Sequence, residues 1–277
     1  MIEILLSTYN GAKYLPEQIK SVLNQSFTDW HLLIRDDGST DETLNILNEY
    51  AEKYPLKIKR VVDDSGNVGV IRSFEILLKN STADYIMFCD QDDFWLPDKI
   101  ELSVEKILQM EKQFGKNIPF LVHTDLKVVD ENRNVISDSM WKFVGLQPKK
   151  ILKSIYNLAL CNCVTGCTIL MNKKAKEVSI PFVYPVEMHD AWIALCVKKY
   201  GEIDFVDTPT IEYRQHEKNL YGAKPEPFSL YKKFLTVKSA IRISKMKYAY
   251  YHPFVFKSVL QFLYHKVKYF YIAHYAK

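Results

Sequence analysis

The sequence lacks an apolar run long enough to cross a membrane. A spanning helix needs about 20 predominantly apolar residues, and polar side chains interrupt every hydrophobic stretch of these 277 residues before that length. Residues 1–7 carry no basic group ahead of a long apolar segment, so they predict a first strand and not a secretory leader. We therefore expect a cytoplasmic protein that does not span the bilayer.

Cysteine is also scarce. The five cysteines are an odd number, and four of them lie in apolar segments, where a reduced thiol behaves as a small hydrophobic group. Cys161, Cys163 and Cys167 are close in sequence, but they form no paired C-x2-C arms and no histidine lies near them. The spacing therefore predicts structural thiols and argues against a zinc site.

Acidic residues are absent from 228–277. This segment holds ten of the 37 Lys and Arg together with fourteen Phe and Tyr, although the net charge of the whole chain is only +4. Helical spacing would put rings on one face and cations on the other, as in helices that lie on an anionic membrane surface. We expect a basic, aromatic helical tail at 223–277 that holds the protein on the inner face of the cell membrane. The alternative is a helical pair packed on the domain, with a basic outer face.

Nucleic acid could also bind basic and aromatic residues of this kind. No recognition motif for DNA or RNA accompanies them in the sequence. We therefore expect no nucleic-acid partner.

Short apolar runs alternate with segments of helical periodicity, which predicts an α/β fold with a mainly parallel sheet. We expect strands at 2–9, 30–35, 58–62 and 85–89, and helices at 14–25, 40–54, 68–80 and 97–114. Ser39 and Glu42 have the spacing of a capping box, so the second helix should begin near Thr40.

The alternation fades after residue 115. We expect further strands at 121–129, 163–171 and 205–214, and helices at 149–158 and 191–200. Residues 222–227 have the composition of a linker. The sequence thus predicts one domain over 1–222, with halves 1–115 and 116–222, followed by the tail.

Polar side chains follow three of the predicted strands, at 7–9, 36–37 and 90–93. In an open parallel sheet, ligands bind beyond the carboxyl ends of the strands, so these groups should meet in one crevice. Three carboxylates within Asp90-Gln91-Asp92-Asp93 would repel one another unless a cation lies between them, and oxygen ligands suit Mg²⁺ or Mn²⁺. A solvated acidic turn is the alternative, but the position after a buried strand favours a ligand site.

Four motifs occur together: Ser-Thr-Tyr-Asn-Gly at 7–11, Arg-Asp-Asp-Gly-Ser-Thr-Asp at 35–41, Asn-Val-Gly at 67–69, and the acidic cluster at 90–93. Through them, residues 2–222 resemble the GT-A glycosyltransferases of family 2. Asp-Gln-Asp-Asp-Phe-Trp at 90–95, His-Asp-Ala-Trp at 189–192 and Tyr-Arg-Gln-His at 213–216 are most similar to the bacterial rhamnosyltransferase group. Ala191 and Glu217 depart from that group, which often has an aromatic residue and a glycine there, so the identity of the sugar stays open.

The resemblance implies a GT-A fold: a single Rossmann-like mixed sheet flanked by helices, with a C-terminal helical tail. It also implies a nucleotide-sugar site. Its residues would be Thr8, Tyr9, Asp36, Asp37, Arg72, Asp90, Gln91, Asp92 and Arg214. In it, Asp36 would accept a hydrogen bond from the N3–H of the base, and Asp90 would touch the ribose or the donor sugar. Lys218 could also meet the phosphates.

The resemblance further implies a metal site and a catalytic base. Asp92, Asp93 and His216 would hold Mn²⁺ or Mg²⁺, and Asp190 would take the proton of the attacking hydroxyl. Each residue has a plainer interpretation by itself. An aspartate before a helix is commonly an N-cap, and a histidine in a polar loop needs no ligand.

The implied function is an inverting transfer of a sugar from a nucleotide diphosphate donor. The best match is L-rhamnose from dTDP-rhamnose, moved to a hydroxyl of a lipid-linked or oligosaccharide acceptor in the synthesis of O-antigen, capsule or cell wall. The alternatives are a UDP-hexose or UDP-N-acetylhexosamine donor, and a non-catalytic subunit that binds a nucleotide sugar or a glycan. A nucleotidyltransferase would need a Gly-rich basic loop after the first strand, and residues 7–13 do not supply one.

Overall fold

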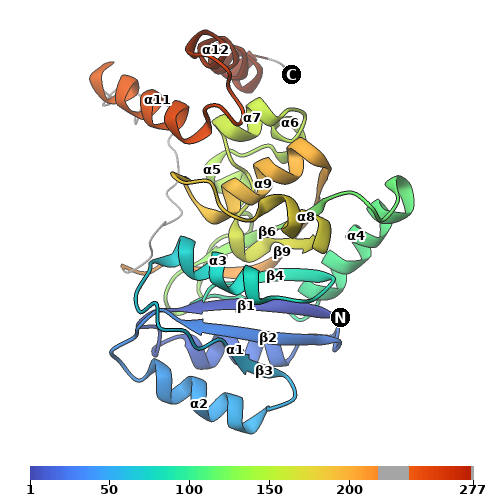
Figure 1. Ribbon diagram of the computed structural model, residues 1–277, viewed down its shortest axis with the longest axis vertical. Helices are drawn as coiled ribbons and strands as arrows, with labels where there is room; N and C mark the ends of the chain where they lie inside the picture. The colour runs from blue at the N-terminus through green and yellow to red at the C-terminus, as the bar shows by residue number, and fades with distance from the viewer. Residues whose placement is uncertain (218–236, 276–277) are drawn as a thin grey trace.

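The computed structural model describes residues 1–217 and 237–275. Within them lies a nine-stranded sheet with the order β3-β2-β1-β4-β8-β6-β9-β5, and β7 pairs with β6 at the side. Helices flank the sheet, and the two C-terminal helices lie at the end of the molecule opposite α2 (Figure 1). The α/β class and the mixed sheet are confirmed.

The first half is built from parallel strands joined by helices. The strands are β1 (Ile2–Thr8), β2 (Trp30–Asp36), β3 (Ile58–Arg60) and β4 (Tyr85–Cys89), and the helices are α1 (Leu15–Leu23), α2 (Thr43–Lys53), α3 (Val70–Asn80) and α4 (Lys99–Phe114). Ile4, Leu5 and Leu6 are fully buried in β1 because side chains pack on both faces of the strand. Every predicted element of this half exists, although β3 ends at Arg60 and not at Val62.

The expected start of α2 near Thr40 is wrong, because the helix begins at Thr43. The Ser39 hydroxyl donates to Asp36 at 2.6 Å and accepts from the Asn10 amide at 2.8 Å, so it does not cap the helix. The Asp41 carboxylate instead accepts from the Thr43 amide at 3.0 Å. The capping-box residues therefore belong to the loop after β2.

The second half contributes antiparallel strands and shorter helices. Its elements are β6 (Phe120–Val129), β7 (Val135–Ser137), α5 (Met140–Val144), α6 (Pro148–Ile151), α7 (Ile155–Leu160), η1 (Gly166–Thr168), β8 (Leu170–Asn172), α8 (Lys173–Ser179), α9 (His189–Tyr200) and β9 (Glu202–Arg214). The short β5 (Phe94–Trp95) of the first half pairs antiparallel with β9. β8 is antiparallel to β4 and β6, whereas β6 and β9 run parallel.

Two predictions for this half are wrong in detail. The strand expected at 163–171 is a 3-10 turn followed by the short β8, because the Gly166 amide donates to the Asp190 carboxylate and not to a strand. The helix expected at 149–158 is divided into α6 and α7. The Ser154 side chain accepts from the amides of Tyr156 and Asn157, so it starts a new helix there.

The C-terminal helices share the core of the domain. α11 (Val237–Tyr251) and α12 (Val259–Tyr275) follow residues 218–236, so the expected linker at 222–227 lies outside the described residues. Tyr251, Val255 and Phe256 are buried in the same hydrophobic cluster as α9. The inner sides of these helices therefore pack against the domain.

All five cysteines are free thiols, and four of them are buried, as expected of structural thiols. Among the described residues, no helix is both long and apolar enough to cross a membrane.

Candidate active site

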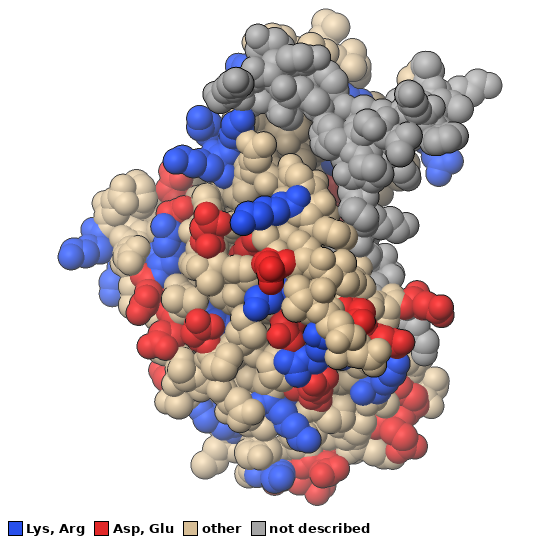
Figure 2. Space-filling view, turned by 180° about the vertical axis from the view of Figure 1, so that it is seen from behind, with Lys and Arg blue, Asp and Glu red and all other residues tan. Residues whose placement is uncertain are grey.

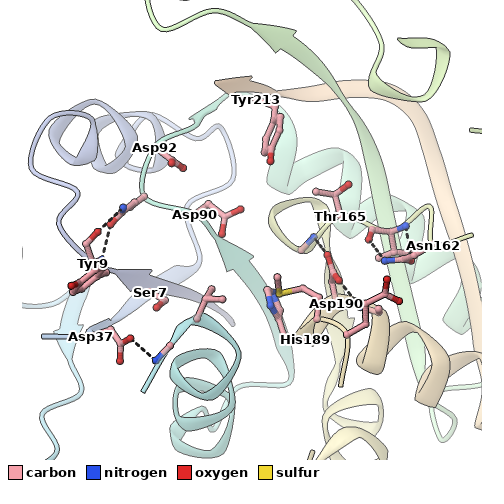
Figure 3. A pocket seen from close by; sticks show the side chains of 18 of the residues that line it. Ser7, Tyr9, Asp37, Asp90, Asp92, Asn162, Thr165, His189, Asp190 and Tyr213 are labelled. Atoms are coloured by element: carbon pink, nitrogen blue, oxygen red, sulfur yellow. Dashed lines mark hydrogen bonds between the residues drawn. The ribbon is translucent and has the colours of Figure 1, made fainter. Parts of the chain in front are cut away.

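A cavity of about 710 Å³ lies beyond the carboxyl ends of β1 and β4. One wall comes from the ends of these strands and from the loop before α3, and the opposite wall comes from segments 162–166 and 187–191 (Figure 3). Seven of the predicted site residues line it: Thr8, Tyr9, Asp37, Asp90, Gln91, Asp92 and Asp190.

Gln91 fixes the loop that follows β1. Its side-chain oxygen accepts from the Tyr9 amide at 2.8 Å, and its side-chain nitrogen donates to the Tyr9 carbonyl at 3.0 Å. A Cβ atom at Gly11 would lie only 2.2 Å from the same Gln91 oxygen, so a side chain there would displace the Gln91 amide from the Tyr9 backbone. The Tyr9 side chain is left 48% exposed at the cavity, where a planar ligand can reach it.

The two carboxylates after β2 have different surroundings. Asp36 does not line the cavity; it accepts from the Thr8 hydroxyl at 2.9 Å and from the Ser39 amide at 2.8 Å. Asp37 does line it, and accepts from the amides of Val68 and Gly69 at 2.9 and 2.8 Å. Asp37 thereby holds the Asn-Val-Gly motif against the end of β2.

Asp90 and Asp92 both face the cavity (Figure 3). Burial, followed by the charges of Asp92 and Asp190, raises the pKa of Asp90 to about 7. The Asp92 carboxylate lies 2.9 Å from Nε2 of His216. The His216 ring in turn stacks on Tyr14, with ring centroids 4.9 Å apart.

A divalent cation fits this donor set. Asp92 and His216 offer oxygen and nitrogen ligands beside each other, as Mn²⁺ prefers. Asp90 and Asp92 line the same cavity two residues apart, and a cation bound there would offset the repulsion between their carboxylates.

Asp93 lies beneath the cavity and does not line it. Its side chain is fully buried, and one carboxylate oxygen accepts from the Arg214 amide at 3.2 Å. Ligand atoms of Asp90, Asp93 and Cys167 lie within 4.8 Å of one another. The buried Lys99 is another neighbour of this cluster, and burial lowers the pKa of its ammonium group to about 8.

Asp190 projects from the first turn of α9 on the wall opposite Asp90 (Figure 3). Its carboxylate accepts from the Gly166 amide at 2.9 Å and from the Ala191 amide at 2.5 Å. Burial raises the pKa of Asp190 to about 7, and the two amide hydrogen bonds oppose this shift. A carboxyl group with such a pKa can exchange a proton near neutral pH.

Besides Asp36 and Asp93, three further predicted residues do not line the cavity. Arg72 lies over the Tyr184 ring, 5.2 Å from its centroid. The Arg214 guanidinium donates to the Asp92 and Glu131 carbonyls at 2.9 and 2.8 Å, and also pairs with Glu17. His216 reaches the site through Asp92, and Lys218 lies outside the described residues.

Sequence reasoning missed most of the second wall. Asn162, Thr165 and Glu187 line the cavity from irregular segments that carry no motif. His189 belongs to the His-Asp-Ala-Trp motif at 189–192, but the sequence predicted no function for its side chain. It is 4% exposed, and neither ring nitrogen has a hydrogen-bond partner among the described residues. Burial lowers its pKa to about 3, so the imidazole is neutral.

The chain is similar to known proteins in sequence and in fold. The family model described as Glycosyl transferase family 2 matches residues 3–178. The dTDP-rhamnosyl transferase RfbG of Shigella flexneri is 27% identical over 248 residues, which are 84% of this chain and 79% of that protein. The UDP-Glc:alpha-D-GlcNAc-diphosphoundecaprenol beta-1,3-glucosyltransferase WfgD of Escherichia coli is 27% identical over 228 residues, 81% of either chain.

Solved structures of TarS from S. aureus are also similar. TarS 1-349 in complex with UDP-GlcNAc aligns with a TM-score of 0.62 and 17% identity, over 99% of this chain and 73% of that one. Another crystal structure of TarS 1-349 aligns with a TM-score of 0.55 and 20% identity, over 77% of this chain and 60% of that one. At these identities the likeness shows a common fold.

Proposed function

The chain belongs to glycosyl transferase family 2 and has the GT-A fold, and we propose that it is a metal-dependent, inverting enzyme that uses Asp190 as its base. The activity class, glycosyl transfer in bacterial polysaccharide synthesis, follows from the family and its relatives. The proposal depends on one observation: Asp190 faces Asp90 and Asp92 across a single cavity.

The nucleotide end of the donor would lie along β1 and the loop before α3. Tyr9 offers a ring for stacking and Asp37 a fixed carboxylate. Asp36 would meet the base only through a change in its present hydrogen bonds to Thr8 and Ser39. Asp90 would then face the ribose or the sugar.

Asp92 and His216 would hold Mn²⁺ or Mg²⁺, with Asp93 supporting them from beneath. A bound cation would offset the charge that develops on the departing nucleoside diphosphate. Arg214 ties the Asp92 backbone to Glu131 and Glu17, so it would position the metal ligand and would not touch the phosphates in the present arrangement.

Asp190 would remove the proton from the acceptor hydroxyl as that oxygen attacks the anomeric carbon. The Gly166 amide holds one carboxylate oxygen at 2.9 Å and so orients the group. Attack from the face opposite the leaving diphosphate inverts the anomeric centre. Rhamnose in a β-linked dTDP donor would therefore become an α-rhamnoside.

We propose dTDP-rhamnose as the donor because RfbG, which aligns with 84% of this chain, is named as a dTDP-rhamnosyl transferase. A UDP-hexose or UDP-N-acetylhexosamine is the second candidate, since WfgD is named for UDP-Glc and the TarS structure holds UDP-GlcNAc. The acceptor would be a lipid-linked or oligosaccharide hydroxyl. WfgD is named for a diphosphoundecaprenol-linked sugar.

A panel of nucleotide sugars tests the proposal. Release of nucleoside diphosphate is measured with Mn²⁺, with Mg²⁺ and with a chelator, for the wild type and for Asp190→Asn. We expect one donor to be consumed only with metal and only by the wild type. If no donor turned over, the proposed enzyme would be overturned in favour of a binding subunit, and if Asp190→Asn kept full activity, Asp190 would be excluded as the base.

A further inference from the structure

α12 has two different sides. Its inner side packs on the domain: Phe262 is 2% exposed, and the His265 ring stacks on Tyr156 with centroids 3.7 Å apart. The Gln261 side chain also donates to the Tyr156 hydroxyl at 3.1 Å. These contacts fix the rotation of the helix about its axis.

The outer side of α12 is apolar and exposed. Its members are Val259, Leu260, Leu263, Tyr264 and Val267, whose exposed fractions run from 46% to 79%. At 3.6 residues per turn, these positions fall within about 140° of the helix circumference. They form one stripe, called here the α12 stripe, that the described residues do not cover.

Cations surround this stripe without any acidic partner in the same segment. Lys257, Lys266 and Lys268 are exposed on or beside α12, and Arg242 and Lys245 are exposed on α11. No Asp or Glu occurs after Glu226. In Figure 2 the acidic side chains lie on the body of the domain, below the end that carries these helices.

We propose that the α12 stripe and its flanking cations dock on the surface of an anionic lipid bilayer. Exposed aliphatic side chains together with Tyr264 suit the boundary between headgroups and acyl chains, and lysines attract anionic headgroups. A second copy of the chain would bring two basic surfaces together, which like-charge repulsion disfavours. Nucleic acid would leave the aliphatic side chains without a partner.

The helix that precedes α12 reaches the wall of the cavity that contains Asp190. Tyr251, the last residue of α11, donates to the carboxylate of Glu187, which lines the cavity three residues before Asp190. If a bilayer bound the α12 stripe, α11 would connect the bound end of the molecule to the wall at which the acceptor would bind. This consequence rests on the proposed function, whereas the docking itself does not.

Sedimentation with vesicles tests the docking on the full chain. We compare vesicles of phosphatidylcholine alone with vesicles that also contain phosphatidylglycerol, using the wild type and the double variant Leu260→Glu/Val267→Glu. The matched control is Leu56→Glu/Val62→Glu, because these side chains are 84% and 80% exposed far from the stripe. We expect the stripe variant to lose about ten-fold or more in affinity for anionic vesicles, and the control to lose little.

Different results distinguish the bilayer from the other possible partners of the stripe. Equal binding by the stripe variant and the control, or wild-type binding no stronger to anionic than to neutral vesicles, would overturn the docking proposal. A smaller mass of the stripe variant in light scattering would identify a second copy as the partner, and displacement from vesicles by duplex DNA would indicate a nucleic-acid surface. Diphosphate release is measured in parallel without vesicles, so a failure of the transferase mechanism is seen independently.

Discussion

The two walls of the cavity are built in different ways. The wall that includes Asp90 and Asp92 follows buried parallel strands, so the backbone ladder fixes where each carboxylate lies. The wall that includes Asp190 depends on hydrogen bonds between distant segments, such as Gly166 to Asp190 and Tyr251 to Glu187. If the proposed function holds, the first arrangement would keep the donor site constant, and the second could change with the acceptor without altering the sheet.

The largest effect is expected from Asp190→Asn. The amide can still accept from Gly166, so the fold should be kept while the proton acceptor is lost. We expect kcat to fall by about 100- to 10,000-fold with little change in the KM for the donor. Steady-state kinetics measure this. The control is Asp204→Asn, because this carboxylate lies outside the cavity and pairs with Lys106. A large rise in donor KM would instead assign Asp190 to the donor wall.

Asp92→Ala should have the next largest effect, because it removes the carboxylate that lies against His216. We expect a loss of about 100-fold or more in activity and a matching loss of the response to added Mn²⁺. His216→Ala should cost less, about 10- to 100-fold, since the carboxylates remain. Titration of Mn²⁺ against rate measures both. An unchanged metal response in Asp92→Ala would contradict this metal site.

The effect of pH on the rate should be smaller. The pKa of Asp190 is raised to about 7 by burial, and only its ionised form can accept a proton. We therefore expect kcat/KM to rise about ten-fold per pH unit below the pKa and to level above it. Rates between about pH 5 and 9 measure this. A profile flat through neutral pH would exclude Asp190 as the titrating base.

The same shift predicts an effect on stability. The folded-state pKa of Asp190 lies above its ordinary value of 3.8, so folding favours the protonated form. The stability that this provides is complete below the unfolded pKa and is lost as the pH rises through about 7. Asp190→Asn should therefore raise the free energy of unfolding by up to about 4 kcal/mol at alkaline pH relative to acid pH. Urea unfolding at both pH values measures the difference, and a constant difference would contradict the raised pKa.

Tyr251→Phe should give the smallest effect. It removes one hydrogen bond to Glu187 and keeps the buried ring in the core. We expect a few-fold rise in the KM for the acceptor and no change for the donor. Tyr264→Phe, on the exposed α12 stripe, is the matched control when the acceptor is soluble. Equal effects on donor and acceptor would show that the C-terminal helices do not act on one wall alone.

Much of the first wall could be predicted from the sequence. Buried strands such as Tyr85–Cys89 are recognisable as apolar runs, and a carboxylate that directly follows one must lie at the edge of the sheet. The second wall was harder to predict. Gly166 and Glu187 reach the cavity through irregular backbone, where side-chain periodicity carries no information.

The sequence by itself determined the α/β class, the family and the acidic cluster at 90–93, because these depend on local patterns and motif spacing. Only the tertiary structure decided that Asp92 and Asp93 have different surroundings, one facing the cavity and one buried with Cys167. Adjacent residues of a chain can point in opposite directions, and their neighbours come from segments far away in sequence. The same reason applies to the tail, whose inner side joins the core while the α12 stripe stays exposed.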